Sequence, residues 1–186
     1  MYNGSEYLEG MLAAYKLRAV PININYHYVT GELQYLYNDA DLVAVVTHQT
    51  FAPHVAEVVN LARKLRHVFS VADQSGAAIH PDFHDYERAL AQSSDVRDFA
   101  PRNSDDLYIV YTGGTTGMPK GVMWHHRDIF FGAMGGGDLD QSRGPIKDPA
   151  ELAGRIGDMA PAALPAPPFM HAAAQWAALS LLFAGG

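Results

Sequence analysis

The sequence predicts an α/β fold, a layered and largely parallel sheet flanked by helices. Segments with apolar residues at helical spacing alternate with short apolar runs along much of the chain, as expected when helices pack on parallel strands. One of these runs, residues 42–47, is continuous, which is typical of a strand buried on both sides. Another run, residues 107–111, leads straight into a glycine-rich loop. Ligands of open α/β sheets bind at such strand ends.

The first elements are expected to be two helices with a short strand between them. Ser5 has a side chain suited to an N-cap, and large apolar residues recur at helical spacing from there to Leu17. Residues 19–23 then indicate a strand. Thr30 is expected to cap the second helix, which continues through Tyr37.

The middle of the chain repeats this alternation. Valines, an alanine and a leucine at intervals of three and four predict a helix over 55–65. Residues 135–160 contain a glycine run, prolines and scattered charges, and are expected to form an irregular insertion. In order, the expected elements are a strand at 42–47, the helix at 55–65, a strand at 68–71, a helix at 83–91, a strand at 107–111 and a strand at 122–124 that returns antiparallel to it.

Composition and charge argue against several classes of protein. Hydrophobic residues make up 48% of the 186 residues, a share typical of a globular chain. No window offers the roughly 20 apolar residues of a spanning helix, and the first residues lack the features of a signal peptide, so a cytoplasmic location is expected. Without cysteine there is no disulfide framework or thiolate metal site. A net charge of −7 argues against a nucleic-acid partner.

The stretch 111–122, which reads YTGGTTGMPKGV, combines four glycines, three threonines and one lysine. Glycines let a backbone approach an anion closely, threonines add hydroxyl donors, and lysine adds a positive charge. The stretch therefore predicts a phosphate-binding loop, with a flexible turn between two strands as the alternative. It is not the common mononucleotide loop, because Gly121 follows Lys120 where a hydroxyl residue is needed. It is not a dinucleotide fingerprint, because Gly113 and Gly114 are adjacent.

This loop resembles the phosphate signature of the adenylate-forming superfamily, which includes acyl-CoA synthetases, luciferase-like enzymes and peptide-synthetase adenylation domains. The resemblance implies a catalytic role for Lys120, which together with the loop amides would stabilise the departing pyrophosphate. It also implies that the threonine hydroxyls contact the β- and γ-phosphates. The implied phosphate-binding residues are Thr112, Gly113, Gly114, Thr115, Thr116, Gly117 and Lys120.

A second segment, 164–176, is similar to the proline-rich segment downstream of that loop in acyl-CoA synthetases, which ends in an aromatic residue or a histidine followed by a helix. His171 stands at this position, and the resemblance implies a catalytic role for it beside the carboxylate substrate and the ATP α-phosphate. The alternative is a helix-capping histidine packed under the sheet. Residues 15–26, 122–126 and 134–137 look most like bacterial fatty-acyl-CoA synthetases.

The resemblance implies a two-step reaction. A carboxylate, expected to be a fatty acid, attacks the α-phosphate of ATP and releases pyrophosphate, and coenzyme A then displaces AMP from the acyl-adenylate. Mg²⁺ is the implied metal cofactor of ATP. No spanning segment is expected, although a long-chain substrate would be compatible with peripheral membrane contact. Another adenylate-forming ligase that shares the loop is the alternative within the enzymes.

The family pattern continues beyond Gly186 with a Tyr-Gly-x-Thr-Glu segment, a ribose-binding aspartate, a hinge arginine and a C-terminal domain that carries a catalytic lysine. We therefore expect an internal piece of the large N-terminal AMP-binding domain, inactive by itself. A non-catalytic nucleotide- or phosphate-binding remnant, or an interaction module, is the rival hypothesis. The expected parts are an α/β segment at 1–100, the phosphate-loop unit at 101–134, the insertion at 135–160 and a segment bordering the acyl and ATP site at 161–186.

Two residue pairs admit other interpretations. His125 and His126 are adjacent and point in different directions, which argues against a shared metal. No metal site is therefore expected, and the pair is expected to begin a helix beneath the phosphate loop. Asp105 and Asp106 could form a catalytic carboxylate pair, but are expected to cap the turn into the strand at 107–111.

Overall fold

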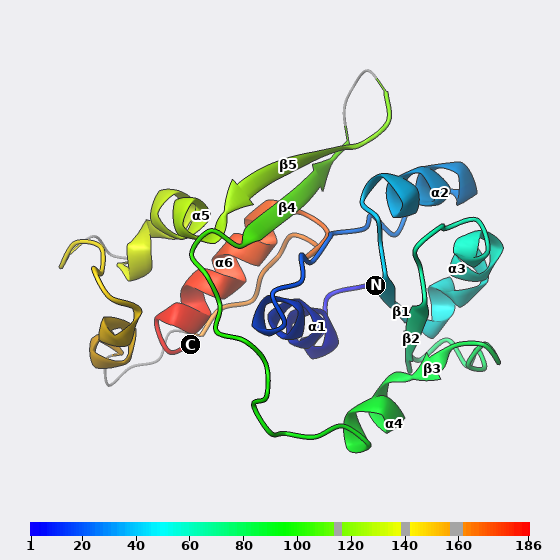
Figure 1. Ribbon diagram of the computed structural model, residues 1–186, viewed down its shortest axis with the longest axis horizontal. Coiled ribbons are helices and arrows are strands. Elements are labelled where there is room, and N and C mark those ends of the chain that lie inside the picture. Colours follow the sequence, from blue (N-terminus) through cyan, green and yellow to red (C-terminus); the bar gives the residue numbers. More distant parts are fainter. Residues whose placement is uncertain (114–116, 139–141, 157–161) are drawn as a thin grey trace.

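Figure 1 shows the computed structural model, which describes residues 1–113, 117–138, 142–156 and 162–186. Two small sheets flanked by helices form its frame, which confirms the predicted α/β class. One sheet is parallel and the other is the predicted antiparallel pair. In sheet order, the parallel sheet contains β1 (Ala44–His48), β2 (His67–Val71) and β3 (His84–Asp85), and the pair contains β4 (Leu107–Thr112) and β5 (Lys120–His125).

The helices divide between the two sheets. α2 and α3 share a hydrophobic cluster with β1, whereas α1, α5 and α6 share another with β4. None of the helices that the structure describes is long and apolar enough to cross a bilayer. The helices are α1 (Ser5–Lys16), α2 (Thr30–Asp39), α3 (Ala52–Val59), α4 (Tyr86–Ala91), α5 (His126–Ala133) and α6 (Ala172–Phe183), with 3₁₀ turns η1 (Gln49–Phe51), η2 (Gly135–Gly137) and η3 (Pro149–Arg155).

The first two helices are capped one residue earlier than predicted. Gly4 precedes α1 and Val29 precedes α2, both in extended conformation, so Ser5 and Thr30 are the first helical residues and not caps. At α2 the backbone amide of Val29 donates to the Glu32 side chain at 3.0 Å. A carboxylate three residues into the helix thus satisfies the backbone amide of the residue at the cap position.

Two other elements are shorter than predicted. α3 ends at Val59 and not near residue 65, because the chain turns there and the backbone amide of Arg63 donates to the side chain of Asn38 at 3.0 Å. The strand predicted at 19–23 reduces to a single bridge, in which Ile22 lies parallel to Ile109 of β4. Both corrections arise from contacts between segments distant in sequence, which local spacing does not encode.

The helix predicted at 83–91 begins at Tyr86. Residues His84 and Asp85 before it form β3, and the side chain of Asp85 accepts the backbone amide of Arg88 at 2.7 Å. An aspartate at the N-cap therefore sets the start of α4.

Strand β4 is buried on both faces. Tyr108 and Val110 join the hydrophobic cluster with α1, α5 and α6, whereas Ile109 and Tyr111 join the cluster with α2, β1 and α3. Side chains alternate along a strand, so a slip of one residue would exchange the two cores, and the register is strongly specified. Two-sided burial was predicted for the run that forms β1, and the strand departs from it at its start, where Ala44 is exposed, whereas Val45, Thr47 and His48 are buried.

Gly121 faces Tyr111 across the hairpin and has no room for a side chain. A β-carbon at this position would lie 3.0 Å from Cγ2 of Ile109 and 3.1 Å from Cε2 of Tyr111. The ring of Tyr111 thus occupies the space above the glycine, and the hairpin needs glycine at the residue that follows Lys120.

We expect Gly121→Ala to lower the free energy of unfolding by about 1–3 kcal/mol, because a methyl group forced into a filled space displaces its neighbours. Gly132→Ala in α5 is the matched control, since its added β-carbon meets nothing within 4 Å. That control should be neutral or stabilising by up to about 1 kcal/mol, because alanine favours helix over glycine. Urea unfolding followed by circular dichroism measures both, and equal stability of Gly121→Ala and the parent would contradict the packing argument.

Candidate functional site

The glycine-rich loop connects β4 to β5 and is the tip of a hairpin (Figure 1). The ladder ends at the pair Thr112 and Lys120, which face each other across the two strands and are both exposed. Gly113 is exposed as well, and Gly117 has a φ of 156°, which residues with side chains rarely adopt. Gly114, Thr115 and Thr116 lie outside the described residues. The predicted position of the loop at the end of a strand is confirmed.

Thr112 and Lys120 project from the face of the hairpin that packs against α6. Directly opposed residues of an antiparallel pair share a face, and Thr112 shares its face of β4 with Tyr108 and Val110 through the period of two. Tyr108 on that face accepts the indole N–H of Trp176 in α6 at 3.1 Å. The hydroxyl of Thr112 and the ammonium group of Lys120 therefore lie on the same face of the hairpin as α6, at its solvent-exposed end.

His171 stands at the start of α6. Its carbonyl accepts the backbone amides of Ala174 at 3.2 Å and Gln175 at 3.4 Å, and its own amide donates to the carbonyl of Pro168 at 2.9 Å. The predicted helix after His171 is present. The side chain makes no capping bond in the helix, and the residue is exposed, so the alternative of a capping histidine packed under the sheet is wrong.

One buried side chain, Asn23, joins the end of β4, from which the phosphate loop begins, to the histidine segment, which is residues 167–171 before α6. Its amide nitrogen donates to the carbonyl of Tyr111 at 3.0 Å and to the carbonyl of Met170 at 2.7 Å, and its amide oxygen accepts the backbone amide of Tyr111 at 2.7 Å. Tyr111 is the residue before Thr112, and Met170 is the residue before His171. The phosphate loop and the histidine segment therefore begin on two sides of one amide group.

Sequence reasoning did not identify Asn23 as a site residue. The one signal in the sequence is a polar residue flanked by isoleucines in a short apolar run. That signal does not indicate which residues the asparagine bonds. The contacts depend on Tyr111 and Met170 reaching the same place in the fold.

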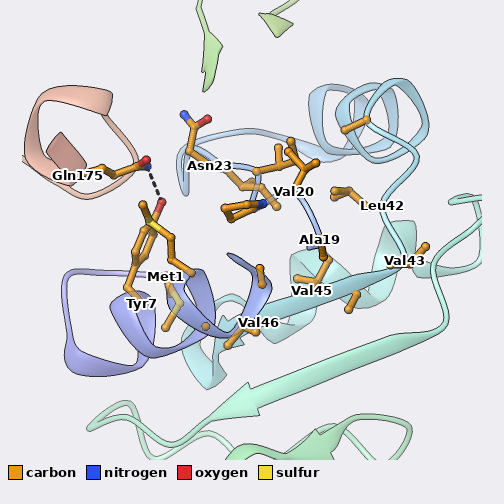
Figure 2. Close-up of a pocket in the computed structure, with 18 of the residues that line it drawn as sticks. Met1, Tyr7, Ala19, Val20, Asn23, Leu42, Val43, Val45, Val46 and Gln175 are labelled. Atoms are coloured by element: carbon orange, nitrogen blue, oxygen red, sulfur yellow. Dashed lines mark hydrogen bonds between the residues drawn. The ribbon is translucent and has the colours of Figure 1, made fainter. Parts of the chain in front are cut away.

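A second polar network fixes the first turn of α6. The side chain of Gln175 is buried and accepts the hydroxyl of Tyr108 at 2.7 Å. Its amide nitrogen donates to the hydroxyl of Tyr7 in α1 at 3.1 Å and to the carbonyl of Phe169 at 2.6 Å, and Figure 2 shows the bond to Tyr7. One glutamine thus joins α1, β4 and the residues just before His171.

An apolar cavity of about 500 Å³ lies between α1, the chain around Ile22 and β1 (Figure 2). In this view the amide of Asn23 points out of the cavity, away from Val20. Thr112, Lys120 and His171 are not among the residues that line it. The cavity therefore does not include the three candidate groups, although Asn23 and Gln175 belong to its wall. Apolar residues of its wall include Val20, Ile22, Leu42, Val43, Val45 and Val46.

The histidine pair lies at the far end of the hairpin from the phosphate loop, because His125 pairs with Leu107 at the start of β4. The expectation that these histidines lie beneath the loop is therefore wrong. Nδ1 of His125 lies 2.9 Å from the carbonyl of Asp105, and Nε2 of His126 lies 3.1 Å from the carbonyl of Leu107. Within the described residues no group of three or more histidine, aspartate or glutamate side chains could hold a metal ion.

Asp106 has a structural role. Its carboxylate accepts the Arg18 guanidinium at 2.7, 3.0 and 3.1 Å and the backbone amide of Asn103 at 2.9 Å. These donors hold the pKa of the Asp106 carboxyl below its usual value. Asp105 pairs with Arg127 at 2.9 Å. The Asp106 carboxylate thus caps the turn into β4, as predicted, whereas the Asp105 carboxylate pairs with Arg127 of α5.

Comparison with known proteins identifies the family. The model of the family described as AMP-binding enzyme matches residues 1–186. The chain belongs to this family. It is 42% identical over 191 residues to a 3-oxocholest-4-en-26-oate–CoA ligase of Rhodococcus rhodochrous, covering 99% of this chain and 33% of the relative. It is 40% identical to the medium-chain acyl-CoA ligase Mig of Mycobacterium avium, covering 99% of this chain and 34% of the relative.

Solved structures share the fold. A red-emitting luciferase from Phrixothrix hirtus superposes with a TM-score of 0.72 at 20% identity, over 98% of this chain and 33% of that one. MatB from Rhodopseudomonas palustris gives a TM-score of 0.71 at 23% identity, over 100% of this chain and 32% of that one. The chain spans about a third of the length of the curated relatives it matches.

We expect alkaline pH to destabilise the protein through the tyrosines of the Gln175 network. Burial raises the pKa of Tyr108 to about 12 and raises that of Tyr7 further, whereas tyrosine in an unfolded chain ionises near pH 10. The phenols ionise more readily in the unfolded chain than in the folded one. Their contribution to the free energy of unfolding is therefore complete below about pH 10 and falls as the pH rises through the folded pKa values.

Urea midpoints measured from about pH 8 to about pH 12 test this expectation. The midpoint should be flat at first and then fall steeply. Tyr108→Phe removes one of the titrating groups, so its profile should fall less steeply than that of the parent. A parent midpoint that stays constant over the whole range would contradict the role assigned to these tyrosines.

Proposed function

We propose that the chain supplies the phosphate loop and the carboxylate-facing histidine of an AMP-forming acyl-CoA ligase. The observation that supports this most directly is that Asn23 bonds both segments, with Thr112 and Lys120 at the hairpin tip and His171 at the start of α6. These segments carry the motifs in which the chain resembles the family, and the family model matches residues 1–186. Because the chain spans about a third of the length of its relatives, the activity is proposed for a whole protein of that length and not for these residues alone.

In the proposed reaction a carboxylate oxygen attacks the α-phosphorus of ATP, and the bond to the pyrophosphate oxygen breaks. The sulfur of coenzyme A then attacks the acyl carbon of the acyl-adenylate, its thiol proton is lost, and AMP leaves. Lys120 and the loop amides stabilise the negative charge that develops on pyrophosphate. His171 donates a hydrogen bond to the carboxylate and holds it beside the α-phosphate.

The remaining phosphate contacts are proposed for the loop residues that the sequence singled out. The hydroxyl of Thr112 and the amide of Gly113 lie at the described base of the loop, on the side of Lys120. Mg²⁺ would share the charge of the phosphates. Gly114, Thr115, Thr116 and Gly117 complete the proposed cradle.

The proposed substrate is a medium- or long-chain fatty acid or an acid with a steroid-like apolar body. The support comes from relatives whose names specify medium-chain acyl-CoA and 3-oxocholest-4-en-26-oate–CoA ligases. ATP and coenzyme A are the proposed co-substrates, and the cytoplasm is the proposed location. The 186 residues alone are proposed to bind ATP and not to complete the reaction. Pyrophosphate exchange by the purified 186-residue chain would overturn this last point.

We expect Lys120→Ala in the whole protein to lower the rate of ATP–pyrophosphate exchange by about 10²- to 10³-fold, the usual effect of losing one preorganised donor to developing charge. Lys147→Ala is the matched control, because Lys147 is also exposed and lies outside the hairpin. It removes the same charge and should leave exchange unchanged. If both variants exchange at the parent rate, Lys120 has no part in phosphate chemistry.

We expect His171→Ala to weaken the use of the carboxylate by about 10- to 100-fold in kcat/KM, the effect of losing one hydrogen bond to a charged group. Binding of ATP should change little, because the phosphate loop keeps its own donors. His54→Ala on α3 is the control, since His54 is exposed and belongs to another part of the fold. A loss that falls equally on the KM of ATP and on the KM of the carboxylate would show that His171 does not hold the carboxylate.

A further inference from the structure

The side chain of Asn23 is 7% exposed and uses both of its amide hydrogens and its oxygen. Its orientation is determined by its partners. The carbonyls of Tyr111 and Met170 can only accept, and the amide of Tyr111 can only donate, so the nitrogen must face the two carbonyls and the oxygen must face the N–H. A flipped amide would lose all three bonds.

Asn23 takes the place of a neighbouring strand. Ile22 lies parallel to Ile109 of β4 through a single bridge, and one residue later the chain no longer pairs with β4 through its backbone. The Asn23 side chain then bonds both the N–H and the C=O of Tyr111, as the backbone of an adjacent strand would. Its remaining hydrogen reaches Met170. The ladder that began at Ile22 thus ends in a group that also binds the histidine segment.

Other side chains also bond the histidine segment, but they do not bond the end of β4 from which the loop begins. The side chain of Asn3 donates to the carbonyl of Pro167 at 3.1 Å and accepts the amide of Phe169 at 2.7 Å, which ties the segment to the start of α1. Gln175 ties Phe169 to α1 and to Tyr108 near the start of β4, at the other end of the strand from the loop. Asn23 bonds the segment at Met170 and β4 at Tyr111, in each case one residue before the candidate functional group.

We infer that Asn23 is a positioning residue that sets the distance between the phosphate loop and His171. The inference rests on the proposed function for its catalytic meaning, whereas the mechanical link is a property of the fold. A carboxylate held by His171 must meet a phosphate held by the loop, and a misplacement of about 1 Å between reacting groups can cost about 10²-fold in rate. Asn23 touches neither group directly and acts through Tyr111 and Met170.

The chain contains a matched control. Asn38 makes the same three kinds of bond to backbone, with its amide nitrogen donating to the carbonyls of Gln34 at 2.9 Å and Leu61 at 3.0 Å and its oxygen accepting the amide of Arg63 at 3.0 Å. These bonds join α2 to the chain after α3. Asn38→Ala therefore removes an equivalent set of hydrogen bonds at a place that holds neither the phosphate loop nor His171.

The first test measures the distance between the two segments in the 186-residue chain. The protein has no cysteine, so cysteines introduced at Met118 in the loop and Ala173 in the first turn of α6, both exposed, can carry spin labels for pulsed dipolar spectroscopy. We expect Asn23→Ala to broaden or shift the distance distribution, and Asn38→Ala to leave it as in the parent. Circular dichroism verifies that each variant is folded.

Asn23→Ser is the second variant, since a hydroxyl can still donate to one of the two carbonyls and leaves less of the network unpaired. It should give a distribution between those of the parent and Asn23→Ala, and it serves as the test where Asn23→Ala does not fold. A distribution identical to the parent in both Asn23 variants overturns the inference. An equal change in Asn38→Ala also overturns it, because the effect would then be general loosening of the fold.

The second test uses ATP–pyrophosphate exchange by the whole protein. Asn23→Ala should lower kcat by about 10²-fold and change the KM of ATP far less, because the loop keeps its donors but loses its placement relative to His171. A larger effect on the KM of ATP than on kcat overturns the positioning role. If Lys120→Ala leaves exchange unchanged, the proposed function fails, and the distance measurement still decides whether Asn23 couples the two segments.

Discussion

The burial of β4 on both faces is the constraint on which the rest of the structure depends. Its residues alternate between two hydrophobic clusters, so the same strand contributes side chains to both cores. Neither core can form correctly unless β4 is in register. The last residue of the strand, Thr112, is exposed. The phosphate loop therefore starts from a strand held on two sides and opens directly into solvent.

This arrangement explains how an exposed loop and an exposed histidine acquire a defined relation. Both candidate groups are solvent-facing, and neither is held by its own side-chain packing. The residues just before them are held instead, Tyr111 and Met170 by Asn23 and Phe169 by Gln175. Buried amides suit this task, because each donates and accepts at once and a misplaced partner leaves a buried polar group unpaired. Hydrogen-bonded supports thus lie under candidate groups that remain accessible.

Much of the fold could be predicted from the chain by local rules. Apolar spacing placed α1, α2, β1, β2, β4 and the return strand close to their observed positions, because those patterns are carried by residues that are neighbours along the chain. The errors occurred where a distant partner decides the outcome. α3 stops early where Asn38 binds the amide of Arg63, and Ile22 pairs with β4 at a single bridge. The glycine, threonine and lysine composition of the hairpin tip predicts anion binding there, and this segment does follow the end of a strand.

The sequence by itself determined the α/β class, the position of the glycine-rich loop and the family resemblance, since each depends on residues that are neighbours along the chain. The tertiary structure alone decided which strand is buried on both faces, that the histidine pair lies at the far end of the hairpin, and that Asn23 joins Tyr111 to Met170. The physical reason is that a hydrogen bond between distant segments requires both to be in place. An asparagine shows in the sequence that it can donate and accept, and only the folded chain supplies the partners.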